Sequence, residues 1–161
     1  MQMEDLLVVK NLKTWFPIKS GIIQRTVGHV KAVDGISFTV HKGETFGLVG
    51  ESGSGKTTAA RSILRLIEPT EGEIHFEGIN VTKAKGKKLR KLRTRIQIIF
   101  QDPYASLDPR QTVNSMLIEA MKIHGVTQSR SEAHEKALEL LNKVGLSEEH
   151  LYRFPHEFSG G

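Results

Sequence analysis

The residues from Gly50 to Thr57, which read Gly-Glu-Ser-Gly-Ser-Gly-Lys-Thr, carry the clearest chemistry in this chain. They fit the pattern G-x-x-x-x-G-K-[ST], in which a glycine-rich loop surrounds a phosphate chain. Glycines allow the backbone to bend so that successive N–H groups point inward at phosphate oxygens. The alternative is a glycine-rich structural turn, but the strand-like and helix-like runs on either side of the loop favour a nucleotide site.

The residue types in this loop suggest a role for each position. A helix that begins near Gly55 should add the positive end of its dipole. Lys56 should reach the β- and γ-phosphates as a point charge, which makes it a candidate catalytic residue. The Thr57 hydroxyl should bind Mg²⁺, because magnesium prefers hard oxygen donors and substrate phosphates. The sequence therefore predicts ATP with Mg²⁺ as the ligand. The nucleotide-binding residues predicted here are Gly50, Ser52, Gly53, Ser54, Gly55, Lys56, Thr57 and Thr58.

Apolar runs predict the elements that would position the loop. The run 45–49 predicts a strand that leads into it, and 58–64 predicts a helix that leads out. The near-continuous apolar run 96–100 predicts a second strand, buried on both faces and stopped at Pro103.

Weaker patterns predict the rest of the fold. Alternating or apolar runs predict short strands at 6–9, 27–33, 36–40 and 74–77, with a turn before Pro17. Helical periodicity is found over 112–124 and 131–144, with Ser131 as a start signal and Gly145 as a stop. The apolar stripe predicted for the second helix consists of Ala133, Ala137, Leu140, Leu141 and Val144.

Composition limits the function classes. The 161 residues include 38% hydrophobic and 25% charged residues, as in a soluble globular domain. With no cysteine, the chain has no disulfide, cysteine-bound zinc or thiol nucleophile. No apolar run approaches 18 residues, and Met1 to Asp5 lacks a signal-peptide pattern. We interpret the protein as cytosolic.

A local basic segment accounts for the net charge of +5. Eight lysines and arginines and no acidic residue lie between Lys83 and Arg95. Leu89 and Leu92 recur at helical spacing, which predicts a short amphipathic helix with a solvated basic face. Contact with acidic lipid headgroups or nucleic acid is the alternative. The segment has no aromatic residues to stack bases, so we expect no nucleic-acid partner.

Three blocks of sequence together resemble the ATP-binding-cassette (ABC) ATPases, in the branch of oligopeptide and dipeptide importers. They are Lys31 to Phe38 with Gly43 to Gly53, then Phe100 to Arg110, then Arg153 to Gly161. The resemblance covers the whole chain. It implies an α/β fold of the P-loop NTPase type, with an N-terminal antiparallel β-subdomain and a helical subdomain.

The resemblance also implies site residues outside the loop. Trp15 matches the aromatic residue that stacks on adenine, with Phe16 or a core role as the alternatives. Gln101 matches the glutamine of the Q-loop. In the family this residue contacts magnesium, has a catalytic role and links the nucleotide site to the membrane partner. Without the other motifs, Gln101 would be interpreted as a polar residue at the end of a strand. Ser159, Gly160 and Gly161 match the start of the signature motif, which binds the nucleotide held by a second subunit.

By the same resemblance, the chain is one incomplete domain. Residues 1–101 would form the nucleotide-binding core and 102–158 the helical subdomain, with 159–161 starting the signature motif. The Walker B aspartate, catalytic glutamate and switch histidine of the family, together with the C-terminal part of the core, are not found in the sequence. We therefore expect an N-terminal fragment that binds ATP weakly and does not turn it over.

The implied partners are a second ATPase subunit in a head-to-tail dimer, permease subunits docked on the helical subdomain and, indirectly, an extracytoplasmic binding protein. The implied location is the cytoplasmic face of the membrane. Three alternatives stay open: a non-catalytic interaction module, a soluble cassette ATPase for translation or repair, and import of another small solute such as nickel.

Overall fold

The computed structural model describes residues 4–102 and 106–158, which fall into two compact units with a boundary between Gln97 and Ile98. The first unit contains β1 (Asp5–Ser20), β2 (Arg25–His41), α1 (Lys56–Ile63), β3 (Glu71–Phe76), β4 (Ile79–Asn80) and α2 (Gly86–Arg93). The second contains α3 (Val113–His124), α4 (Arg130–Lys143) and the 3₁₀ turns η2 (Glu148–Tyr152) and η3 (Pro155–Glu157).

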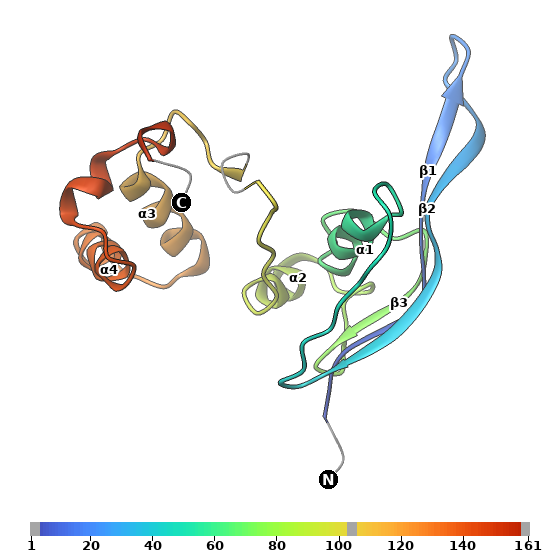
Figure 1. Cartoon of the computed structure of the whole chain (residues 1–161), viewed down its shortest axis with the longest axis horizontal. Coiled ribbons are helices and arrows are strands. Elements are labelled where there is room, and N and C mark those ends of the chain that lie inside the picture. Colours follow the sequence, from blue (N-terminus) through green and yellow to red (C-terminus); the bar gives the residue numbers. More distant parts are fainter. Residues whose placement is uncertain (1–3, 103–105, 159–161) are drawn as a thin grey trace. The chain divides into compact units, whose positions relative to one another are not determined.

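An antiparallel sheet in the order β2-β1-β3-β4 forms the frame of the first unit. β1 pairs with β3 only between Leu7 and Lys13, whereas its pairing with β2 continues to Ser20. The β1–β2 ribbon therefore extends beyond β3 as a two-stranded hairpin (Figure 1).

The strands of this ribbon are longer than the sequence patterns predict. The turn expected before Pro17 is wrong, because β1 continues through Pro17, which lies opposite His29. A proline is tolerated there because β1 has only one neighbour at this point, so one strand edge needs no donor. The segments expected at 27–33 and 36–40 form the single strand β2, which passes Gly35 with φ +89 at a register irregularity.

The core of the first unit lies between this sheet and the helices. It contains Val9, Leu12, Val33, Ala59, Ile74, Phe76, Val81, Ala84 and Leu92. The basic helix predicted around Leu89 and Leu92 is confirmed as α2: Leu92 is buried and Leu89 packs against the same core. Arg93 fixes α2 to the end of α1 by donating to the carbonyls of Leu64 and Arg65.

Two predicted strands are absent from the described structure. Residues 45–49 and 96–100 are in no strand, and Val49 and Ile99 are each 93% exposed. A strand in a parallel sheet needs hydrogen-bonding neighbours, and the described residues include no parallel strand to pair with either run. Phe46 instead stacks on Phe38 of β2, with 4.7 Å between the ring centroids.

The second unit is a helical pair closed by η2. Thr112 caps α3 by accepting from the Ser115 amide, and Gly125 ends the helix in the left-handed region at φ +64. Ser129 caps α4 by accepting from the Glu132 amide, so the start signal assigned to Ser131 is wrong by two residues.

The core of the second unit contains Met121, Ala133, Ala137, Leu141 and Leu151. Three of the five residues in the predicted stripe are therefore buried. Leu140 is 41% exposed and Val144 is 71% exposed, because α3 and η2 cover only one side of α4 and α4 ends before Val144. Within the described residues, none of the helices has both the length and the apolar character to cross a membrane.

Candidate nucleotide-binding site

Glycines shape the loop from Gly50 to Thr57 in the structure. Gly53 and Gly55 have φ of +80 and +93, a region that residues with a Cβ rarely adopt. Gly55 is the residue before the first turn of α1, and the Ala59 amide donates to its carbonyl at 2.8 Å. The expected helix is thus confirmed, with the glycine loop directly at its N-terminus.

Space also requires glycine at position 55, and position 50 is close to a neighbouring side chain. A Cβ on Gly55 would lie 2.0 Å from the backbone oxygen of Ala32 in β2, so the loop and β2 are in direct backbone contact. A Cβ on Gly50 would lie 2.7 Å from the Ser54 hydroxyl oxygen. Ser54 in turn donates its amide to the Glu51 carbonyl at 3.2 Å, which closes the loop on itself.

The first turn of α1 presents unused donors beside Lys56. No side chain caps this helix in the part of the chain that the structure describes, since its N-cap residue is Gly55. The first amides of a helix have no intrahelical partner and carry the positive end of the dipole. The half-buried Lys56 side chain turns back over the loop, where Nζ lies 2.7 Å from the Gly50 oxygen, 2.6 Å from the Glu51 oxygen and 3.3 Å from Ser54 Oγ. The loop thus gathers amide donors and an ammonium group, the requirements for binding polyphosphate.

A cavity of about 370 Å³ lies between this loop and β2. Its lining combines the loop with one stretch of β2 and the start of α1: Lys31, Ala32, Val33, Asp34, Ile36, Leu48, Val49, Gly50, Ser54, Gly55, Lys56 and Ala59. Lys31 and Asp34 are its charged residues besides Lys56. Its size lies within the range of small-molecule sites.

Trp15 is linked to this cavity through the two charged β2 residues. Its indole N–H donates to Asp34 Oδ1 at 3.0 Å, and Lys31 Nζ lies 4.7 Å from the ring centroid and 3.3 Å from Asp34 Oδ2. Lys13 Nζ lies 5.4 Å from the same ring, and its pKa is raised, mainly by its hydrogen bond to Glu71. A base stacking on Trp15 would displace the ammonium group over that face of the ring.

A buried polar pair connects the strand that carries Trp15 to the helix that carries Lys56. The hydroxyls of Thr14 and Ser62 lie 2.8 Å apart, with the two residues 1% and 0% exposed. This hydrogen bond fixes α1 against β1 at the residue next to Trp15.

Several of these contacts have no signal in the sequence. Asp34 and Lys31 belong to the family-like segment from Lys31 to Phe38, but no sequence pattern predicts their contacts with Trp15. The Thr14–Ser62 pair joins residues 48 positions apart, so its partners could be known only from the fold.

Some of the remaining predicted residues belong to the first unit and others do not. Gln101 is exposed and belongs to the second unit, shortly before residues 103–105, which lie outside the described residues. Ser159, Gly160 and Gly161 lie outside the described residues. Ser52, Thr57 and Thr58 belong to the loop and the first turn of α1, and the Thr57 side chain is exposed.

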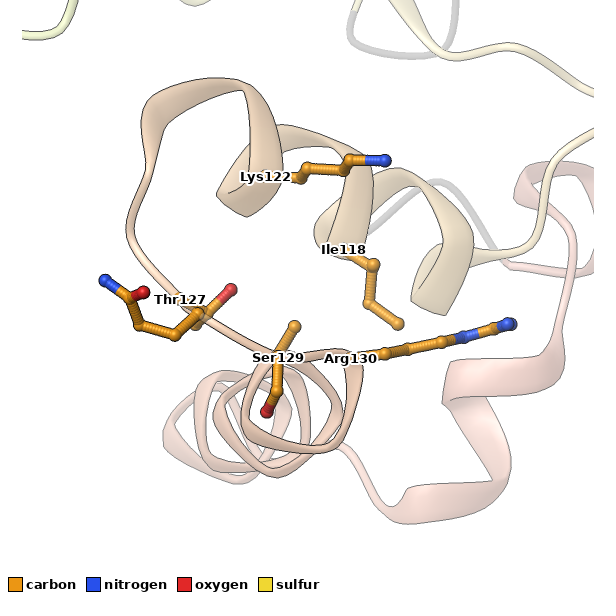
Figure 2. A pocket seen from close by; sticks show the side chains of 7 residues that line it. Ile118, Lys122, Thr127, Ser129 and Arg130 are labelled. Carbon is orange, nitrogen blue, oxygen red and sulfur yellow. The ribbon is translucent and has the colours of Figure 1, made fainter.

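The second unit has its own cavity of about 390 Å³, where the end of α3 faces the start of α4 (Figure 2). Ile118 and Lys122 reach it from α3, Arg130 from the first turn of α4 and Ser129 from the N-cap of that helix (Figure 2). None of the predicted nucleotide-binding residues lines it. The described residues contain no cluster of three or more His, Cys, Asp or Glu side chains suited to a metal ion.

Comparison with known proteins gives consistent matches. A family model described as "ABC transporter" matches residues 33–161. The oligopeptide transport ATP-binding protein AppF of Bacillus subtilis is 52% identical over 159 residues, which cover 98% of this chain and 48% of the relative. The glutathione import ATP-binding protein GsiA of Escherichia coli K12 is 51% identical, over 98% of this chain and 25% of the relative. The chain therefore spans about half the length of the first of these relatives and a quarter of the second.

Solved structures agree with the sequence matches. A dimeric, post-hydrolysis structure of the ATP-binding cassette MJ0796 bound to ADP and Pi is 27% identical with a TM-score of 0.74, covering 96% of this chain and 64% of that one. A second dimeric structure of this bacterial ABC transporter cassette is 25% identical with a TM-score of 0.72, with the same coverage. The expected fold class, the ABC ATPase form of the P-loop NTPase fold, is thereby confirmed.

Proposed function

The chain belongs to the ABC transporter family, and from this membership we propose that it forms the phosphate-binding part of an ATPase subunit that powers peptide import. Both relatives described above are named as import or transport ATP-binding proteins, one for oligopeptides and one for glutathione, itself a peptide. This chain would bind ATP with Mg²⁺ and pass the effect of binding to a membrane partner.

The observation that carries the proposal is the loop before α1. Gly53 and Gly55 adopt positive φ, the first turn of α1 has no side-chain cap, and Lys56 turns back over the loop. This combination of inward amides, helix dipole and ammonium group suits the β- and γ-phosphates. Magnesium, when bound, would shield phosphate charge, and the exposed Thr57 hydroxyl beside Lys56 is the residue suited to hold it.

Other residues would complete the site. Trp15 would form the adenine platform, held in orientation by Asp34. Gln101 would contact magnesium and relay the nucleotide state to the membrane partner. Ser159 to Gly161 would act on the nucleotide of a second subunit in a head-to-tail dimer. These three assignments rest on the family resemblance of the residues.

We infer that this chain binds nucleotide without turnover. Phosphoryl transfer requires a residue that positions the attacking water and magnesium held from two sides. Lys56 and Thr57 hold phosphate and metal, but neither positions water. We also propose that residues 102–158 dock a permease, which would place the protein at the cytoplasmic face of the membrane.

A titration with Mg-ATP tests the proposal directly. Trp15 is the single tryptophan, so its fluorescence reports on binding beside the loop, and calorimetry gives the affinity independently. We expect Lys56→Ala to weaken binding about 10- to 100-fold, since a hydrogen bond to a charged group contributes about 1.5–3 kcal/mol. Lys88→Ala, an exposed change on α2 in the same unit, should leave the affinity unchanged.

Two results would contradict the proposal. One is equal Mg-ATP affinity for Lys56→Ala and the unchanged chain. The other, which concerns turnover alone, is hydrolysis at a rate typical of intact ATPases that is lost in Lys56→Ala.

A further inference from the structure

The turn at the tip of the β1–β2 hairpin has an unusual amino-acid composition. Gly21 to Gln24 connect the strands, with the Gln24 amide donating to the Gly21 carbonyl at 3.1 Å. The two central positions are Ile22 and Ile23, which are 103% and 77% exposed. Turns of this kind normally carry Gly, Pro, Asn, Asp or Ser at such positions. Two isoleucines this exposed bury little apolar surface and so contribute little stability to the fold, and local violations of this kind point to function.

Further apolar side chains continue from the tip along the hairpin. Ile18 on β1 is 46% exposed, and Val27 and Val30 on β2 are 66% and 55% exposed. This part of the ribbon extends beyond β3 as two strands alone (Figure 1). The exposed isoleucines of the tip are therefore continued by further exposed apolar side chains along the same hairpin.

The charge of the hairpin has a single sign. The sequence has no aspartate or glutamate between Asp5 and Asp34. Lys19 and Arg25 stand on either side of the turn, and both are exposed. In the part of the chain that the structure describes, neither forms an ion pair. The tip thus combines exposed isoleucines with two uncompensated positive charges.

We propose that this hairpin tip docks on an anionic lipid bilayer. Ile22 and Ile23 enter the boundary between headgroups and acyl chains, while Lys19 and Arg25 pair with anionic headgroups. Apolar side chains flanked by lysine and arginine suit this interface, because the aliphatic stems follow the apolar residues and the charges stay at headgroup level. A second copy of the chain is disfavoured as occupant, since tip-to-tip contact would bring four positive charges together. This contact is independent of nucleotide binding and of any permease.

Vesicle binding by the whole chain tests the proposal. Vesicles of phosphatidylcholine alone are compared with vesicles that contain about one-third phosphatidylglycerol, by co-sedimentation at low salt. We expect binding to the anionic vesicles only. Ile22→Ser/Ile23→Ser should weaken it by about tenfold for each isoleucine. Lys19→Gln/Arg25→Gln should weaken it by about fivefold for each charge. The control Lys87→Gln/Lys88→Gln, on the exposed face of α2, removes the same charge and should have little effect.

A labelled tip gives a second, independent measurement. Because the chain has no cysteine, Ile22→Cys accepts a single environment-sensitive fluorophore. Its emission should shift to the blue on anionic vesicles, and the emission of a label at Lys88→Cys should not. Three outcomes overturn the proposal: no binding to anionic vesicles, binding that depends on Lys87 and Lys88 but not on the isoleucines, or a tip whose isoleucines affect only self-association.

Discussion

Replacement of Gly55 by alanine tests how closely the phosphate loop is built against β2. Two costs add at this position. An L-residue in the left-handed region costs about 1–2 kcal/mol, partly offset by about 0.4–1 kcal/mol because alanine restricts the unfolded chain. The new Cβ would also lie 2.0 Å from the Ala32 oxygen, whereas real Cβ atoms essentially never approach within 3.0 Å. The loop and β2 must separate by about 1 Å, and overpacking of this kind costs about 1–3 kcal/mol.

Gly53→Ala is the matched control. Gly53 has a similar φ of +80, but a Cβ there would meet nothing within 4 Å. It should therefore show only the conformational cost, a net loss of about 1 kcal/mol. Gly55→Ala should be less stable than Gly53→Ala by about 2 kcal/mol, the middle of the range for overpacking.

Urea unfolding followed by Trp15 fluorescence measures the difference, because the single tryptophan reports on the first unit alone. With a slope of about 1–2 kcal/mol per molar urea, the midpoint of Gly55→Ala should fall about 1–2 M below that of Gly53→Ala. Equal midpoints would mean that the close approach of Gly55 to Ala32 does not exist in solution, and the steric reasoning would be wrong.

Three further changes have defined outcomes. Thr14→Val should lower the free energy of unfolding by about 1–3 kcal/mol, because it leaves the buried Ser62 hydroxyl unpaired. In the same urea assay, the double change Thr14→Val/Ser62→Ala should cost less than the sum of the two single changes. Additive costs would contradict the pairing. Asp34→Ala should shift the emission maximum of Trp15 and weaken Mg-ATP binding. Asp34→Asn keeps a hydrogen-bond acceptor for the indole N–H, so both effects should be smaller. Identical Trp15 spectra for the two variants would refute the hydrogen bond between Asp34 and Trp15. The pKa of Glu73 is lowered from 4.5, mainly by the hydrogen bond from the imidazole two residues along β3. Its contribution to stability is therefore present above pH 4.5 and is lost as pH falls through the lowered pKa. Glu73→Gln should reduce this loss of stability at acid pH, in unfolding measured at pH 3 to 6.

Elements specified by nearby residues could be predicted from the sequence. The helices α3 and α4 end at glycines, and their starts are set by hydroxyl caps within three residues of the first turn. The start of α1 follows from the glycine loop in the same way. The cap at Ser129 also had a signal in the sequence, because Glu132 follows it by three residues, the spacing of a capping box, whereas Glu135 follows Ser131 by four.

Elements that depend on distant partners could not be predicted. The apolar runs 45–49 and 96–100 have strand composition, but a strand exists only where another strand offers its hydrogen bonds. The full length of β1 depends on β2, which pairs with it as far as the turn at Gly21. The hydrogen bond of Trp15 to Asp34 crosses 19 positions, and neither residue type indicates the other.

The ammonium group of Lys56 has three N–H donors, and its three contacts with Gly50, Glu51 and Ser54 use all of them. An incoming anion must therefore compete with two peptide oxygens and a hydroxyl for an ammonium group whose donors are already hydrogen-bonded. Only the difference between the old and new partners then counts toward affinity. A weak, singly charged acceptor gains almost nothing by this exchange, whereas a polyphosphate tail, with several charged oxygens, more than replaces what is given up. We therefore expect the loop's own carbonyls to set a threshold that favours triphosphates over simple anions.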